Sequence, residues 1–207
     1  MKIALIGASG YTGSMILSEA LWRGHQVTAI VRDAARLVRH PALAIKSLDV
    51  VQTNELAALI AGHDAVVSAF NPGKDPNGRG TVSIVAAVKI AKAPRLLVVG
   101  GAGSLEIAPG KRVVDQPDFP AQWKEHALKT AAFLEALKAE PELNWTFLSP
   151  AANLVPGERT GKYRLGGDRL LVDASGDSRI STEDFAVAML DEIEKPRHQR
   201  KRFTVAY

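Results

Sequence analysis

The chain has 207 residues and a formal net charge of +4, and 46% of its residues are hydrophobic and 23% charged. A chain of this size and composition builds one substantial core, so we expect a single domain over residues 1–207. Because cysteine is absent, disulfides, thiolate catalysis and cysteine-bound zinc are excluded. The five histidines have no metal-ligand spacing, so no metal site is predicted.

No charged amino-terminal segment precedes an apolar stretch, and no apolar run is long enough to cross a bilayer. We therefore expect a cytoplasmic protein without a membrane partner. The sequence is compatible with an oligomer but does not define one.

Apolar strand patterns alternate with helical patterns as far as Pro150, which is typical of βαβ units. The predicted strands are Lys2–Ile6, Gln26–Val31, Leu43–Leu48, Ala65–Ala69, Arg95–Val99 and Asn144–Leu148. The predicted helices are Tyr11–Arg23, a short helix Asp33–Val38 capped by Asp33, Thr53–Ala61, Gly80–Lys92 and Pro120–Ala139. The expected fold class is α/β, a Rossmann-like doubly wound parallel sheet with helices on both faces.

Glycines divide the segment after Pro150 into short pieces, which we expect to form a small carboxyl-terminal region that covers the substrate. It contains a strand-like stretch, Arg169–Ala174, and a helix that starts at an N-cap, Ser181 or Thr182, and ends near Glu194. The basic run from Lys195 to Arg202 is interpreted as a solvated turn before a final strand, Phe203–Tyr207. Nucleic acid is disfavoured as its partner, because aromatic residues are not interleaved for base stacking.

Three glycines separate the first strand from the first helix: Gly7, Gly10 and Gly13. Gly7 can end the strand in a tight turn, Gly10 allows the backbone to approach a pyrophosphate, and Gly13 allows the helix to pack closely on the sheet. The helix amino terminus offers free N–H groups to phosphate oxygens. A plain tight turn is the alternative, which the strand before and the helix after disfavour.

The residue at the end of the second strand selects the dinucleotide, because a carboxylate there accepts from a ribose hydroxyl and an arginine pairs with a 2′-phosphate. Arg32 occupies this position, and Asp33 follows as the helix N-cap. The sequence therefore predicts NADP (NADPH) as cofactor, with NAD as the alternative if Arg32 is only a surface arginine.

Other candidate cofactor contacts lie in the glycine turn or directly after predicted strands, where parallel strands end at one edge of the sheet. They are Ser9, Tyr11, Thr12, Asp49, Val50, Ala69, Phe70, Gly100, Gly101 and Pro150.

Five segments together resemble the NAD(P)H-binding atypical short-chain dehydrogenases, in particular the NADH-flavin reductase group, with biliverdin reductase B and NmrA-like proteins as more distant relatives. The segments are Gly7–Gly13, Val31–Asp33, Leu97–Ser104, Trp145–Ala151 and Arg159–Gly167. The resemblance runs essentially from end to end, and it implies a Rossmann-like domain that binds NAD(P)H through the three glycines and Arg32.

The Tyr-x-x-x-Lys pair of the better known short-chain dehydrogenases is absent. The three tyrosines are followed four positions later by Met15, by Gly167 or by the chain end. Without this acid, ordinary carbonyl reduction is disfavoured, whereas hydride transfer to a conjugated ring needs less from the protein. Ser104, His126 and Tyr163 are the remaining candidates for substrate contact or proton donation, and each has a structural role as its alternative.

The sequence thus favours an NADPH-dependent reductase that transfers a hydride to a small-molecule acceptor, flavin-like, aromatic or quinone-like. The alternatives are an NmrA-like protein that senses NAD(P) without turnover and a protein similar to nucleotide-sugar epimerases or dehydratases.

Overall fold

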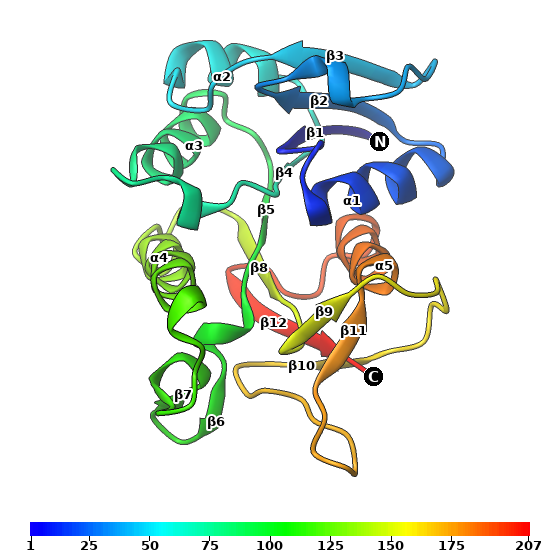
Figure 1. The fold of residues 1–207 in the computed structure, drawn as a ribbon. Helices are drawn as coiled ribbons and strands as arrows, with labels where there is room; N and C mark the ends of the chain where they lie inside the picture. The colour runs from blue at the N-terminus through cyan, green and yellow to red at the C-terminus, as the bar shows by residue number, and fades with distance from the viewer.

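The computed structural model describes all 207 residues and is built around one eight-stranded sheet with the order β10-β12-β8-β5-β4-β1-β2-β3 (Figure 1). Its strands are β1 Lys2–Ile6, β2 Gln26–Val31, β3 Leu43–Ser47, β4 Ala65–Ser68, β5 Leu96–Val99, β8 Trp145–Ser149, β10 Arg164–Gly166 and β12 Lys201–Ala206. All neighbours are parallel except β10, which pairs antiparallel with β12. The predicted Rossmann-like sheet is confirmed.

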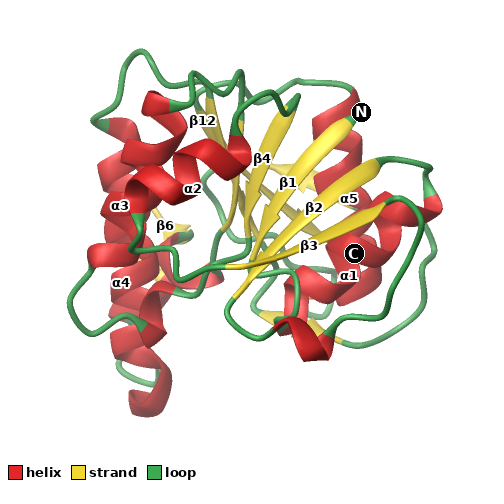
Figure 2. Ribbon diagram, turned by 90° about the horizontal axis from the view of Figure 1, so that it is seen from above, coloured by secondary structure: helices red, strands yellow, loops and turns green.

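Helices cover both faces of this sheet, with α2, α3 and α4 on one side and α1 and α5 on the other (Figure 2). They are α1 Tyr11–Trp22, α2 Thr53–Ile60, α3 Arg79–Ile90, α4 Ala121–Lys138 and α5 Thr182–Glu194. Successive side chains of β1 alternate between the two cores: Ile3 and Leu5 join the α1 and α5 side, and Ala4 and Ile6 the other. Strands buried on both faces explain the continuous apolar runs in the sequence.

Two small pairs complete the structure. Strands β6 Glu106–Ala108 and β7 Lys111–Arg112 form a hairpin, and β9 Asn153–Val155 pairs with β11 Arg179–Ser181. Ser181 caps α5 as predicted, since its side chain accepts from the backbone N–H of Asp184. None of the helices combines the length and the hydropathy that a membrane-spanning segment requires.

The predicted strands and helices up to Pro150 agree with the structure within two residues, apart from the short helix after the second strand. That helix is one 3-10 turn, Ala34–Arg36, although Asp33 caps it as predicted by accepting from the N–H of Ala35. It stops there because Leu37 is extended, with φ −108° and ψ 134°.

The predicted strand Arg169–Ala174 is wrong. Its segment has one isolated bridge, between Arg169 and Glu106, and then bends where the Asp173 carboxylate accepts from the N–H of Ser175. The place beside β12 is taken by β10 instead. The final strand also starts two residues earlier than expected, at Lys201, so the basic run is not wholly a turn.

Candidate cofactor site

The glycine turn between β1 and α1 lies at the centre of the sheet, where the chain order reverses between β1 and β4. Ligands of doubly wound sheets bind at this switch point, beyond the carboxyl ends of the strands. Gly7 has φ +79°, and a Cβ there would lie 2.8 Å from the carbonyl oxygen of Ala69. Its N–H donates to the carbonyl of Ile30 at 2.9 Å, which fixes the turn to β2. Only glycine satisfies this combination of dihedral angle and close approach.

The start of α1 is open toward this turn. Gly10 is the N-cap and has no side chain to cap the helix, and the first intrahelical bond runs from Ser14 N–H to its carbonyl at 2.9 Å. The N–H groups of the three residues between them therefore precede the helical ladder and are available to an anion. A Cβ on Gly13 would lie 2.1 Å from the Gly7 carbonyl oxygen, so α1 packs directly on the turn. The residues present fit the pyrophosphate of a dinucleotide.

Arg32 extends from the end of β2 and is exposed. Its carbonyl accepts from the Ser47 hydroxyl at 2.9 Å, but its guanidinium has no hydrogen bond or ion pair within the protein. The carboxylate of Asp33 is occupied as a helix cap and lies 3.5 Å from the Arg36 guanidinium. At the end of β2 the charged group without a partner is therefore the Arg32 guanidinium. A cation there suits a phosphate rather than a ribose hydroxyl.

The other strand ends contribute backbone and packing. Gly100 follows β5, and a Cβ there would lie 2.1 Å from the Phe147 ring. Gly101 follows it, and Pro150 is buried directly after β8. These residues lie at the same edge of the sheet as the glycine turn, as expected.

Several of the predicted contact residues also make contacts within the protein. Val50 is buried in the core, and the Asp49 carboxylate accepts from the N–H of Val51 at 3.3 Å. The Phe70 ring packs on Gly80, where a Cβ would lie 2.4 Å from it. Tyr11 is 58% exposed, and its hydroxyl lies 3.4 Å from the carbonyl oxygen of Leu154 in β9.

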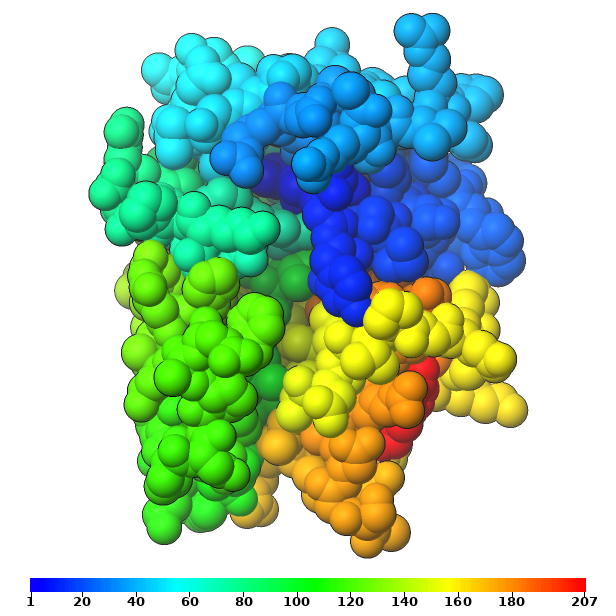
Figure 3. Space-filling model, viewed as in Figure 1, coloured from blue at the N-terminus to red at the C-terminus, as the bar shows by residue number.

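A cleft opens beside the glycine turn, between the green segment that contains α4 and the yellow segment that contains β9 (Figure 3). Among the predicted catalytic residues, His126 lies on the first half of α4. Its ring is 2.4 Å from a Cβ placed on Gly73, in the segment that follows β4, and 6.3 Å from the ring of Trp123. Trp123 is 57% exposed, so the amino-terminal half of α4 carries an aromatic side chain that can contact a ligand.

The hydroxyls of Ser104 and Tyr163 are engaged elsewhere, although the turn that contains Ser104 packs on α4. Ser104 turns back along the sheet, where its hydroxyl accepts from the Arg202 guanidinium at 3.0 Å. The Tyr163 hydroxyl donates to the Asp191 carboxylate near the end of α5. Burial and the neighbouring Asp191 carboxylate raise the pKa of Tyr163, so its phenol holds its proton.

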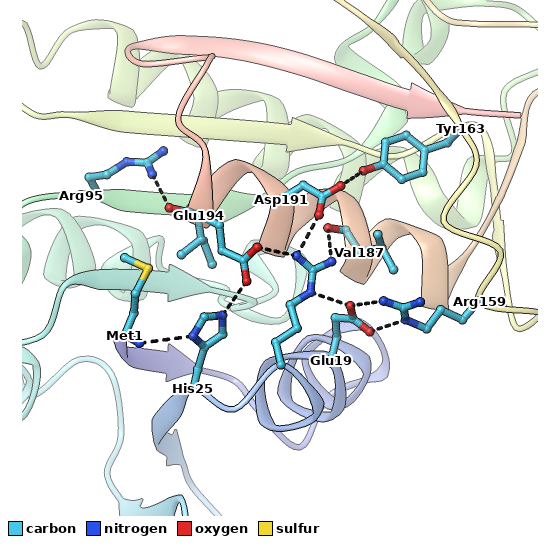
Figure 4. Close-up of polar contacts among 11 residues, drawn as sticks. Met1, Glu19, His25, Arg95, Arg159, Tyr163, Val187, Asp191 and Glu194 are labelled. Atoms are coloured by element: carbon cyan, nitrogen blue, oxygen red, sulfur yellow. Dashed lines mark hydrogen bonds and ion pairs between the residues drawn. The ribbon is translucent and has the colours of Figure 1, made fainter.

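Tyr163 belongs to a charged cluster that the sequence did not reveal (Figure 4). Glu19 on α1 is 6% exposed, and it accepts from Arg23 at 2.7 Å and from Arg159 at 2.7 and 2.8 Å. Arg23 continues the cluster to Asp191 at 2.8 Å. Burial acts to raise the pKa of Glu19, but the hydrogen bonds from the two arginines outweigh it and hold that pKa below its ordinary value.

The hydrogen bonds from Arg159 to Glu19 hold the segment 156–163 against α1. The Arg159 guanidinium also lies 4.2 Å from the centre of the Trp22 ring. The spacing of four residues between Glu19 and Arg23 is a sequence signal for an ion pair on one helix. No local signal marks Arg159 as the third residue of this cluster.

Comparison with known proteins agrees with this geometry. Residues 7–196 match a family model described as NAD(P)H-binding. The chain is 47% identical to the uncharacterized protein YwnB of Bacillus subtilis (strain 168), covering 99% of this chain and 98% of that protein.

Two solved structures extend the comparison. One is a "putative epimerase" from Bacteroides thetaiotaomicron, with 47% identity, coverage of 100% of this chain and 96% of that one, and a TM-score of 0.95. The other is SP1627, a "putative NADH-flavin reductase" from Streptococcus pneumoniae TIGR4, with 39% identity, coverage of 100% and 99%, and a TM-score of 0.87. The match over nearly the whole chain and the open glycine turn lead to one conclusion: the chain belongs to the NAD(P)H-binding family of reductase-like Rossmann proteins.

Proposed function

We propose that this protein is an NADPH-dependent reductase that transfers a hydride to a flavin-like, small aromatic or quinone acceptor. The observation that carries the NADPH preference is the unpaired, exposed guanidinium of Arg32 at the end of β2. An arginine that already had a carboxylate partner would gain less from a 2′-phosphate than one whose only partner is water. The NADH-flavin reductase description of SP1627, at 39% identity, supports a flavin-type acceptor.

In this proposal the N–H groups at the start of α1 bind the pyrophosphate, with the Ser9 and Thr12 hydroxyls as further donors, and Arg32 binds the 2′-phosphate. Bound NADPH supplies the hydride. The chain's contribution is to orient the nicotinamide near Gly100, Gly101 and Pro150 and to leave the adjoining cleft open to the acceptor.

A conjugated ring accepts a hydride without a protein acid, because solvent can protonate the product. Ser104 and Tyr163 are engaged elsewhere, by Arg202 and Asp191 respectively. His126 therefore remains our candidate for a group that donates a proton or contacts the acceptor, together with the exposed ring of Trp123.

Cofactor titration of wild type and Arg32→Ala tests the preference. We expect NADPH binding to weaken by about 1.5–3 kcal/mol, the range of charged hydrogen bonds, and NADH binding to change little. Arg39→Ala removes the same charge from the same exposed segment and serves as the matched control. Equal losses for NADPH and NADH in Arg32→Ala would assign Arg32 a structural role.

Turnover is tested with NADPH and FMN, riboflavin or a benzoquinone in steady state. Oxidation that saturates with the acceptor supports the reductase. Tight NADPH binding without oxidation above the protein-free rate would instead support a protein that senses NAD(P).

A further inference from the structure

A second hollow lies at the opposite end of the parallel strands from the glycine turn, and the proposed function makes no use of it. Its volume of about 760 Å³ falls within the range of small-molecule sites. It is formed by the amino ends of β8 and β12, the end of α4 and the residues after β10. Because β10 runs antiparallel to β12 and its last residue, Gly166, pairs with Thr204, the chain after β10 continues toward the start of β12.

Several charges in this hollow are already neutralised. The Arg202 side chain is 6% exposed and donates to the Asp168 carboxylate at 2.7 Å. Lys138 pairs with Glu135 at 2.9 Å, and Glu140 pairs with Lys89 at 2.8 Å.

Two cations of the hollow have no counter-charge. The Arg200 guanidinium donates only to the Pro141 carbonyl, at 3.2 Å, and the Lys201 ammonium has no hydrogen-bond or ion-pair partner. Among the acidic residues that line the hollow, Glu106 has no ion pair. It lies next to Asp168, because the Glu106 N–H donates to the Asp168 carbonyl at 2.9 Å. The basic run is therefore not only a solvated turn, because it supplies one wall of a concave site.

A histidine on the same wall is held in a fixed orientation. Nδ1 of His198 lies 2.8 Å from one oxygen of the buried Glu192 carboxylate, and the other oxygen accepts from His198 N–H at 2.9 Å. The imidazole stacks on Phe203, with ring centres 4.1 Å apart and planes 9° apart. Its Nε2 has no hydrogen-bond partner. The side chain is 23% exposed, and His198 is one of the residues that line the hollow. The carboxylate contact at Nδ1 fixes the ring and leaves Nε2 as the ring nitrogen free to contact a ligand.

We propose that this hollow binds a small phosphate-bearing anion through Arg200, Lys201 and Nε2 of His198. A phosphate offers several oxygens to charge-assisted donors, and it can also donate a P–O–H proton to a neutral Nε2. A nucleic acid fits less well, because the aromatic ring of the lining, Trp145, is 4% exposed and offers no stacking surface.

The test is calorimetric titration of the full-length protein with inorganic pyrophosphate, and with inorganic phosphate in parallel, at saturating NADPH. The bound cofactor occupies the glycine turn, so this arrangement separates the two sites. We expect saturable binding that weakens about tenfold or more in Arg200→Gln/Lys201→Gln, since two charged donors are lost. The control Lys195→Gln/Arg197→Gln removes the same charge from the same segment outside the lining and should retain wild-type affinity.

Amide and imidazole chemical shifts of the wild-type protein locate the anion without any substitution. Shifts at residues 198–202 support the proposal even if the double variant does not fold. Absence of saturable binding, equal losses in the two double variants, or shifts confined to residues 7–13 would each overturn it. Failure of this test would leave the NADPH titrations of Arg32→Ala unaffected.

Discussion

Gly10 and Gly13 lie three residues apart, and the structure predicts opposite consequences for alanine at the two positions. At Gly13 the new Cβ would be 2.1 Å from the Gly7 carbonyl oxygen, whereas ordinary contact starts at 3.4 Å. The obstacle is backbone, so α1 and the turn must separate by about 1.3 Å, the difference between the two distances. Overpacking of this kind costs about 1–3 kcal/mol, and we expect Gly13→Ala to fall near the upper value.

At Gly10 the backbone has φ −81° and ψ 172°, which any residue adopts, and the nearest atom to a Cβ is 3.3 Å away. Gly10→Ala should therefore lower the free energy of unfolding by less than about 1 kcal/mol. In the proposed binding mode its methyl group would stand where the backbone approaches the pyrophosphate, so NADPH affinity should fall about tenfold or more, which is about 1.4 kcal/mol.

Urea unfolding measures the first quantity, and NADPH fluorescence titration of the folded variants measures the second. Wild-type NADPH affinity in Gly10→Ala would contradict the proposed contact between the glycine turn and the pyrophosphate. Unfolding of Gly13→Ala at the wild-type urea concentration would contradict the close packing of α1 on the turn.

Three further predictions concern the charged cluster. Glu19→Gln should lower the free energy of unfolding by about 2 kcal/mol at neutral pH, because two arginines lose their buried partner, whereas the exposed control Glu135→Gln should cost less than about 0.5 kcal/mol. Because the folded-state pKa of Glu19 lies below its ordinary value of 4.5, its contribution is present above that value and is lost as pH falls through the folded pKa. The difference between wild type and Glu19→Gln in urea unfolding should therefore shrink in acid, and a difference independent of pH would contradict this account. Tyr163→Phe should cost about 1 kcal/mol of stability and leave kcat unchanged, while a large fall in kcat at wild-type stability would return Tyr163 to the active site.

The sheet and the glycine turn could be predicted because their signals are local. Residues buried on both faces of a strand give continuous apolar runs, and the roles of Gly7 and Gly13 follow from their positions between one strand and one helix. Asp33 was assignable as a cap for the same reason, since its carboxylate acts only two residues away.

The hydrogen bonds of the predicted catalytic residues could not be predicted from local sequence signals, because these bonds join distant segments. Ser104 meets Arg202 across 98 positions, and Tyr163 meets Asp191 across 28. The prediction of a strand at Arg169–Ala174 was wrong for a related reason. A short strand-like stretch does not say which segment reaches the free edge of β12, and β10 occupies that edge.

The most direct test of hydride transfer in the cleft is stopped-flow oxidation of NADPH that carries deuterium at one or the other C4 position. We predict oxidation that saturates with a flavin or quinone acceptor, a primary isotope effect for only one of the two labelled cofactors, and recovery of that deuterium in the product where exchange is slow. An isotope effect for neither label, with oxidation no faster than without protein despite tight NADPH binding, would contradict the account.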